Sequence, residues 1–287
     1  MNFERKPLSA GLYFVATPIG RARDITLRAL DILAVADVIA AEDTRTARKL
    51  MEIHGVPLDG RQLVAFHDHS GDAPVARLVT AIKEGRSVAY VSEAGTPLVA
   101  DPGYELAAAV IAAGLPVTAA PGPSAVLGAL TVSGLPTDRF AFVGFLPAAK
   151  AQRETEIAAL RDVPFTLVFY ESPKRVGEML GNLRDVLGGE RQAVVCRELT
   201  KKFEEIRRDT LATLATGLED APVKGEIVVL VDRHRGDSVS DGDLDTDLRA
   251  ALQGNSVKDA AAIVAEMHNM PRRKIYQLAL EIAKGEG

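Results

Sequence analysis

The chain has 287 residues, 47% of them hydrophobic and 25% charged, a composition typical of a globular protein. At roughly 150 residues per domain, this length predicts about two domains. A single cysteine excludes a disulfide framework, and with only five scattered histidines a structural zinc site is not expected. The net charge of −5 excludes a uniformly basic surface, so any contact with nucleic acid must come from local basic patches.

No segment has the length of a membrane-spanning helix, since the longest unbroken apolar run is Leu106–Ala113. The N-terminus has no long apolar segment and no credible cleavage site, so a secretory signal is not expected. Together with the single cysteine, these features predict a cytoplasmic protein.

The first part of the chain alternates short β-branched runs with amphipathic segments of helix length. Strands are expected at Leu12–Ala16, Val38–Ala41, Leu63–Phe66, Ser87–Val91 and Pro116–Ala119. Helices are expected between them, the first capped by Asp24 and the later ones ending near His54, Gly85 and Gly114. This alternation indicates βαβ units and a largely parallel sheet, so residues 1–134 are predicted to form an α/β domain.

The alternation pauses at Ser133–Pro136, a plausible linker, and then restarts. Strands are expected at Phe140–Val143, Phe165–Tyr170, Gln192–Arg197, Glu204–Arg208 and Glu226–Val231. Helices are expected at Arg153–Arg161, Pro173–Leu187 and Thr210–Leu218. Residues 135–232 are therefore predicted to form a second α/β domain, in which mixed strand directions remain an alternative.

The last part of the chain is predicted to be a linker followed by helices. Residues 233–247 are polar, acidic and glycine-containing, which favours a flexible connection. Residues 248–287 are helical in pattern, with a helix from Val257, a turn at Asn269–Pro271 and a second helix opened by Arg272-Arg273-Lys274. Two helices around a tight turn resemble a helix-turn-helix. Its apolar stripe fits a structural or dimer-stabilising role nearly as well as nucleic-acid binding.

Clusters of glycine, proline and charged residues follow the predicted strands. They begin at Thr17, Glu42, His67, Ser92, Pro121, Glu171 and Glu198. An ordinary βα turn explains any one of them, because such turns also need these residue types. In parallel α/β sheets, however, ligands bind outside the carboxyl ends of the strands. Seven clusters in this position therefore predict a ligand cleft.

Several common sites are excluded by the absence of their motifs. No G-x-G-x-x-G follows the first strand, no P-loop sequence occurs, and no G-x-S-x-G nucleophile elbow is present. His67 and His69 lack a carboxylate partner for a metal site, so loop polarity or a substrate contact is favoured and no bound metal is expected. Cys196 ends an apolar strand and is predicted to be a buried, inert thiol.

Seven motifs occur in a fixed order along the chain. They are YFVATPIGRARDIT at Tyr13–Thr26, AEDTR at Ala41–Arg45, AGTPLVADPG at Ala94–Gly103, PGPSA at Pro121–Ala125, FYESPKR at Phe169–Arg175, RELTK at Arg197–Lys201 and KGEIV at Lys224–Val228. The ordered set closely resembles the tetrapyrrole methylase superfamily of S-adenosylmethionine-dependent enzymes. Within it, the chain resembles the subfamily that methylates the ribose 2′-hydroxyl of a cytidine in the decoding region of 16S rRNA.

The resemblance implies two α/β domains with S-adenosylmethionine in the cleft between them. The cofactor contacts that it implies are Pro18, Ile19, Gly20, Gly95, Thr96, Val99, Ser124, Ala125, Tyr170 and Glu226. Tyr170 and the Glu226 region are expected to cover the adenine. Core packing is the alternative role for Ile19 and Val99.

Methyl transfer to a ribose requires help with the hydroxyl proton. A protonated hydroxyl is a poor nucleophile, so a base, or a cation that stabilises the developing alkoxide, accelerates the reaction. The catalytic candidates are Glu42, Asp43 and Lys201. For Glu42 and Asp43 the alternative is a helix N-cap with a first-turn charge.

Contacts with 16S rRNA, within the 30S subunit, are expected from basic residues at the strand ends and in the tail. These are Arg45, His67, Lys174, Arg175, Arg197, Arg272, Arg273 and Lys274. The planar guanidinium of arginine suits phosphates, whereas a solvated surface is the ordinary alternative for short basic runs.

The resemblance also implies a homodimer. Two other functions remain alternatives, namely C-methylation of a tetrapyrrole such as uroporphyrinogen, and cofactor sensing without catalysis.

Overall fold

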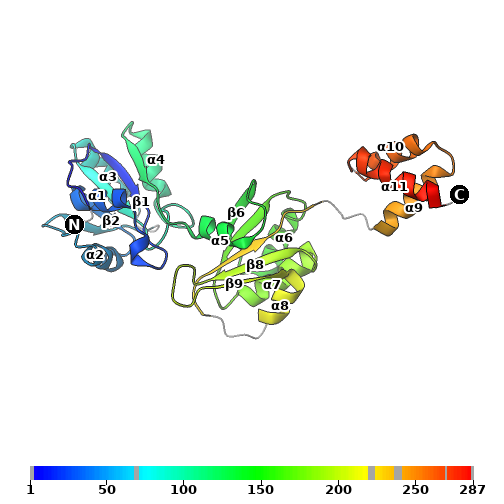
Figure 1. Ribbon diagram of the computed structural model, residues 1–287. Coiled ribbons are helices and arrows are strands. Elements are labelled where there is room, and N and C mark those ends of the chain that lie inside the picture. The colour runs from blue at the N-terminus through cyan, green and yellow to red at the C-terminus, as the bar shows by residue number, and fades with distance from the viewer. Residues whose placement is uncertain (1–2, 68–70, 219–223, 236–240, 269, 286–287) are drawn as a thin grey trace. The chain divides into compact units, whose positions relative to one another are not determined.

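The computed structural model describes residues 3–67, 71–218, 224–235, 241–268 and 270–285. It divides into two compact units, Met1–Arg233 and His234–Gly287. The described residues of the first unit form two five-stranded sheets with their helices, and those of the second unit are helical (Figure 1).

The first sheet is entirely parallel, as the alternation of elements predicted. Its strands are β1 (Gly11–Val15), β2 (Val38–Ala41), β3 (Gln62–Ala65), β4 (Ser87–Val91) and β5 (Val117–Ala120), in the order β3-β2-β4-β1-β5. Every residue of β2 and β4 is buried, because helices cover both faces of a parallel sheet.

Helices connect these strands and pack in two hydrophobic clusters, one on each face of the sheet. They are α1 (Leu27–Val35), α2 (Thr44–Ile53), α3 (Asp72–Lys83) and α4 (Tyr104–Ala112). A further helix, α5 (Ala125–Ser133), follows the last strand. The N-cap of α1 is Thr26 and not Asp24, which was expected to cap it. The Thr26 side chain accepts a hydrogen bond from the Ala29 amide, whereas Asp24 ends a 3₁₀ turn, η1 (Ala22–Asp24).

The second sheet has mixed strand directions, the alternative left open by the sequence. Its strands are β6 (Phe140–Phe145), β7 (Thr166–Glu171), β8 (Gln192–Arg197), β9 (Glu205–Thr210) and β10 (Ile227–Val231), in the order β6-β7-β10-β8-β9. Within the described residues of this sheet, β6 and β7 are parallel neighbours, and the other neighbouring strands are antiparallel. The helices are α6 (Lys150–Ala159), α7 (Val176–Leu187) and α8 (Leu211–Leu218).

Helix α5 joins the two sheets of the first unit. It begins after the last strand of the first sheet, and its residues Val126, Ala129 and Leu130 pack against buried side chains of the second sheet. Cys196 lies in this cluster, where burial raises the pKa of its thiol to about 11, as expected for an inert cysteine.

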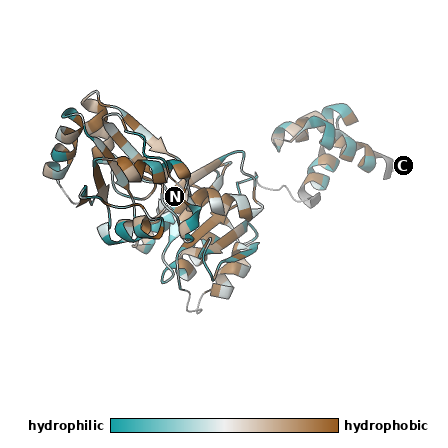
Figure 2. Ribbon diagram, turned by 60° about the vertical axis from the view of Figure 1, so that its left-hand side comes forward, coloured by the Kyte–Doolittle hydropathy of each residue, from teal (hydrophilic) through white to brown (hydrophobic). Residues whose placement is uncertain are grey.

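The strands are mainly hydrophobic, while the helices carry both hydrophobic and hydrophilic residues (Figure 2).

The second unit contains α9 (Asp241–Leu252), α10 (Val257–Met267) and α11 (Arg272–Gly285) around one hydrophobic cluster. The expected linker, residues 233–247, is too long, because α9 begins at Asp241. Leu244 and Leu248, four residues apart, are both buried in the cluster, and their packing outweighs the polar composition of this segment. Asn269 of the expected turn lies outside the described residues. No helix in the described ranges has the length and hydropathy needed to cross a membrane.

Candidate active site

A cavity of about 590 Å³ lies in the first unit, at the carboxyl ends of β1, β2, β4 and β5 and against the second sheet. All ten residues expected to contact the cofactor line it, namely Pro18, Ile19, Gly20, Gly95, Thr96, Val99, Ser124, Ala125, Tyr170 and Glu226. The catalytic candidates Glu42 and Lys201 line it as well. Residues predicted from separate motifs therefore converge on one cavity.

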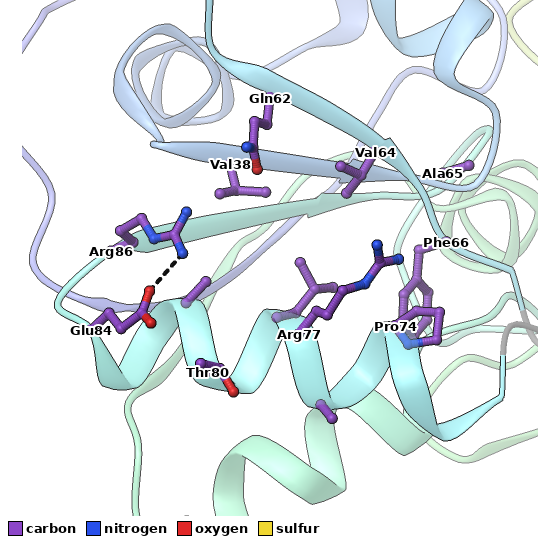
Figure 3. A pocket seen from close by; sticks show the side chains of 13 residues that line it. Val38, Gln62, Val64, Ala65, Phe66, Pro74, Arg77, Thr80, Glu84 and Arg86 are labelled. Atoms are coloured by element: carbon purple, nitrogen blue, oxygen red, sulfur yellow. Dashed lines mark hydrogen bonds and ion pairs between the residues drawn. The ribbon is translucent and has the colours of Figure 1, made fainter.

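A second cavity, of about 490 Å³, lies between α3 and the side of the first sheet formed by β3 and β2 (Figure 3). Its polar groups include Glu84 and Arg86, which pair with each other at 2.7 Å. No residue expected to hold cofactor or to act in catalysis lines this cavity. The larger cavity at the strand ends is therefore the candidate active site.

Three turns of the first sheet are hydrogen-bonded into one wall of the cavity. Thr17 and Gly95 form a bridge, in which the Thr17 amide donates to the Gly95 carbonyl at 2.8 Å and the Gly95 amide donates to the Thr17 carbonyl at 3.0 Å. The Thr96 hydroxyl donates to the Pro123 carbonyl at 2.9 Å, which adds the turn before α5. The residues on these turns thus hold fixed positions around the cavity.

The loops that border the cavity contain strained backbone. Leu98 and Ala100 have φ angles of 73° and 59°, and Glu198 and Thr200 have φ angles of 52° and 64°. In the described part of the chain, only Asp59 is a further non-glycine residue with positive φ. Such strain costs roughly 1–3 kcal/mol per residue and is concentrated at functional sites. Its presence in two cavity loops supports a functional role for this site.

An aromatic cluster forms the wall on the side of the second sheet. The Tyr170 ring lies 4.9 Å from the ring of Phe142 and 5.7 Å from that of Phe145, measured between centroids. Burial, together with the nearby Asp101 carboxylate, raises the pKa of Tyr170 to about 12. The Tyr170 hydroxyl is therefore neutral at physiological pH.

Phe145 lines the cavity but was missed in the sequence, where the strand was expected to end at Val143. The strand continues through a β-bulge between Phe142 and Gly144, and Gly144 has a left-handed φ of 81°. A glycine within a strand pattern is a known sign of a bulge, so Gly144 could have indicated the continuation. The bulge brings Phe145 beside Tyr170.

Lys201 is held by two carboxylates. Its Nζ lies 2.9 Å from Glu198 Oε1 and 2.9 Å from Glu226 Oε2. Glu198 Oε1 also accepts a hydrogen bond from the Glu226 amide at 3.0 Å. Partial burial lowers the pKa of Lys201, but the two carboxylates outweigh it, and the net pKa is raised above the ordinary 10.5. Lys201 is therefore an ammonium ion at neutral pH, able to donate hydrogen bonds but not to accept a proton.

The loop that carries Lys201 packs directly on the turn after β1. A Cβ added to Gly20 would lie 2.4 Å from Thr200 Oγ1 and 2.7 Å from Lys201 Cγ, so only glycine permits this approach. The Arg21 guanidinium also donates to the Thr200 carbonyl at 3.2 Å. These contacts hold Lys201 beside the turn that follows β1, at the wall of the cavity.

The adjacent residues Glu42 and Asp43 have different surroundings. Glu42 lines the cavity, and its Oε2 accepts a hydrogen bond from the Glu93 amide at 3.2 Å. Asp43 lies outside the lining and caps α2 by accepting hydrogen bonds from the Arg45 and Thr46 amides. Hydrogen bonds from the Arg45 guanidinium and amide lower the pKa of Asp43 to about 2. The structure thus shows for Asp43 the capping role that was the alternative to catalysis.

The residues expected to contact RNA do not form one group. Arg175 makes its contacts within the protein. Its guanidinium pairs with the buried Glu171 at 3.2 Å and donates a hydrogen bond to the Leu146 carbonyl at 2.8 Å. Arg197 pairs with Glu205 at 2.9 Å and is also mostly buried. Both arginines thus have protein partners in the structure, and their contact with RNA phosphates stays a prediction.

The other basic candidates are exposed and lie outside the cavity lining. Arg45 donates two hydrogen bonds to Asp43, at 3.2 and 2.9 Å, and its own side chain is 90% exposed. His67 and Lys174 are exposed at the ends of β3 and β7. Arg272, Arg273 and Lys274 are exposed in the first turn of α11, in the second unit.

Two protein families match the chain. Residues 11–215 match Tetrapyrrole (Corrin/Porphyrin) Methylases, and residues 238–283 match the RsmI C-terminal HTH domain. The chain is 46% identical over 286 residues to "Ribosomal RNA small subunit methyltransferase I" of Mesorhizobium japonicum, covering 98% of this chain and 96% of that protein. It is 44% identical to the protein of the same name from Vibrio cholerae, covering 94% of each.

Solved structures show the same fold. Uroporphyrin-III-C-methyltransferase from Thermus thermophilus is similar with a TM-score of 0.55 and 25% identity, over 77% of this chain and 94% of that chain. Diphthine synthase is similar with a TM-score of 0.60 and 19% identity, over 78% of this chain and 91% of that one.

Proposed function

The chain belongs to the ribosomal RNA small subunit methyltransferase I group of the tetrapyrrole methylase family, and we propose that it 2′-O-methylates a cytidine in the decoding region of 16S rRNA. The methyl donor is S-adenosylmethionine. The observation that carries this proposal is a single cavity that combines ten expected cofactor contacts with a fixed ammonium ion.

The cavity fits the cofactor in size and chemistry. Its volume of about 590 Å³ falls in the usual range for small-molecule sites. We place the adenine against Tyr170 and Phe145, and the methionine end near Gly95, Thr96 and Val99. Ser124 caps α5, and the amides at this helix start suit the cofactor carboxylate.

The protein's part in the reaction is to position the ribose and to manage its proton. The cofactor supplies an electrophilic methyl group, so an O–C bond forms as the C–S bond breaks. We assign to Lys201 the stabilisation of the developing alkoxide and to Glu42 the acceptance of the hydroxyl proton. The Asp43 carboxylate stays with α2 as its cap.

The partner is 16S rRNA, which we place within the 30S subunit, in the cytoplasm. Arg272, Arg273 and Lys274 support contact with phosphates, because cations at a helix N-terminus are unfavourable next to the positive end of the helix dipole. An anion bound beside them removes this repulsion.

We also propose a homodimer, which is supported by the exposed apolar residues Tyr104 and Ile111 on α4.

The second candidate function is C-methylation of a tetrapyrrole, which is favoured by the similarity to uroporphyrin-III-C-methyltransferase. To separate the two, the protein is incubated with methyl-labelled S-adenosylmethionine and either 30S subunits or uroporphyrinogen III. We expect label in 16S rRNA, in a dinucleotide that resists alkali because its 2′-oxygen is blocked. Label in the tetrapyrrole would establish the second candidate. Label in neither, with cofactor bound, would favour a sensing protein.

A matched pair of substitutions tests the roles of the two adjacent carboxylates. Glu42→Gln is expected to lower kcat by about 10²-fold or more, as loss of a general base does. Asp43→Asn is expected to keep kcat within about twofold, because asparagine caps helices as well as aspartate. Single-turnover methylation of 30S subunits measures both. Equal losses in the two variants would contradict the assignment of the base to Glu42.

A further inference from the structure

The turn that follows Lys201 carries an aromatic ring into solvent. In the connection between β8 and β9, the Glu204 amide donates to the Lys201 carbonyl at 3.3 Å, which closes a turn with Lys202 and Phe203 at its centre. Phe203 is 63% exposed. Central turn positions usually hold polar residues or glycine. Because the Phe203 ring is mostly exposed, it buries little apolar surface and contributes little to the stability of the fold.

This turn is braced against the active site and does not move freely relative to Lys201. The Thr200 amide donates to Glu204 Oε2 at 2.6 Å, and the Lys201 amide donates to the Glu198 carbonyl at 2.9 Å. The Lys201 side chain is at the same time fixed in the cavity by Glu198 and Glu226. One rigid loop therefore presents an ammonium ion to the cavity and a ring outside it.

The ring is accompanied by a second cation. Lys202 is exposed, and its Nζ lies 5.4 Å from the centroid of the Phe203 ring, within cation–π distance. An aromatic face beside a mobile cation is the combination with which proteins bind unpaired nucleotides, the ring stacking on the base and the cation neutralising the phosphate. A single exposed phenylalanine needs no explanation by itself, but this one has the required neighbours.

We infer that Phe203 and Lys202 form a stacking platform for an unstacked base of the RNA substrate. The inference rests on the proposed function and adds to it how the substrate is held. Phe203 and Lys201 are two residues apart, which separates their backbones by at most about 7 Å. The platform thus reaches the base of the nucleotide whose ribose meets Lys201, or that of its neighbour. Recognition of RNA by unstacked bases on aromatic side chains is common.

Phe203→Trp provides a direct test, since the chain contains no tryptophan. A cytidine-containing single-stranded oligoribonucleotide is titrated into this variant. We expect its fluorescence to be quenched by the RNA and not by S-adenosylmethionine alone. The matched control is Phe140→Trp, a partly exposed ring at the opposite end of β6 from Phe145. No quenching of Phe203→Trp, or equal quenching of both variants, with RNA bound, would overturn the platform.

Kinetics on 30S subunits give an independent test. Phe203→Leu keeps an apolar side chain but removes the ring, and it is expected to raise KM for 30S about five- to 150-fold, with little change in kcat or cofactor affinity. Phe203→Tyr should restore the wild-type KM. An unchanged KM in Phe203→Leu, or a change in its oligomeric state in sedimentation, would overturn the inference. Quenching by RNA without methyl transfer by the wild type would instead refute the proposed function.

Discussion

Replacing Lys201 by methionine is expected to lower kcat by about 10²- to 10³-fold, as the loss of a donor to a developing oxyanion does. Methionine keeps much of the length and apolar contact of lysine but removes the ammonium ion that lies between Glu198 and Glu226. Cofactor affinity is expected to change far less, which isothermal titration calorimetry can measure. A kcat near that of the wild type would contradict the role of Lys201 as the cation.

The pH dependence follows from the direction of the pKa shifts. The pKa of Lys201 is raised above 10.5, so its charge, and the stability that its ion pairs contribute, persist through neutral pH and are lost only as the pH rises through that raised value. Lys201 lowers the pKa of Glu198, whose contribution is lost only as the pH falls below the ordinary 4.5 toward that lowered value. Loss of the Lys201 charge therefore cannot account for a fall in kcat between pH 7 and 9.

The turns of the cavity could be predicted from the sequence because their chemistry is local. Gly20, Gly95 and Ser124 occupy positions after strands, where the backbone must turn sharply or begin a helix, and residues with these properties are few. Parallel strands then bring such turns together at one edge of the sheet. Local residue types and the regular geometry of the sheet were therefore sufficient to predict which turns line the cavity.

The surroundings of other residues depend on contacts that residue types alone do not show. Arg175 and Arg197 were expected at phosphates, and the structure adds their ion pairs with Glu171 and Glu205, four and eight residues away in the chain. Glu42 and Asp43 are adjacent acids, and only the direction of α2 determines which of them faces the cavity. The polar composition of residues 233–247 likewise did not predict that α9 begins at Asp241, because formation of this helix depends on packing within the second unit.

Replacing Gly225 by alanine is expected to lower kcat by about 10²-fold, the loss that a 1 Å misplacement of a catalytic group can cause. Gly225 has a φ of 95°, and an added Cβ would lie 2.4 Å from both Cγ and Cδ of Glu198. The methyl group must therefore displace the carboxylate that fixes Lys201. Methylation kinetics and denaturant unfolding measure the two consequences, on kcat and on the free energy of unfolding.

Gly188→Ala separates backbone strain from this displacement. Gly188 has a similar φ of 99° at the end of α7, but an added Cβ would have no neighbour within 4 Å. It is expected to lower the free energy of unfolding by about 1–3 kcal/mol, the cost of a non-glycine residue in a sparsely populated backbone conformation, with kcat unchanged.

If Gly225→Ala acts by displacing Glu198, its effect on kcat must disappear when Glu198 is already truncated. The double variant Gly225→Ala/Glu198→Ala should then have the kcat of Glu198→Ala alone, because both substitutions remove the same support from Lys201. Losses that add in the double variant would show that the alanine acts by another route, such as direct contact with a ligand in the cavity. Non-additivity would instead establish that the fit of Gly225 against Glu198 positions the ammonium ion.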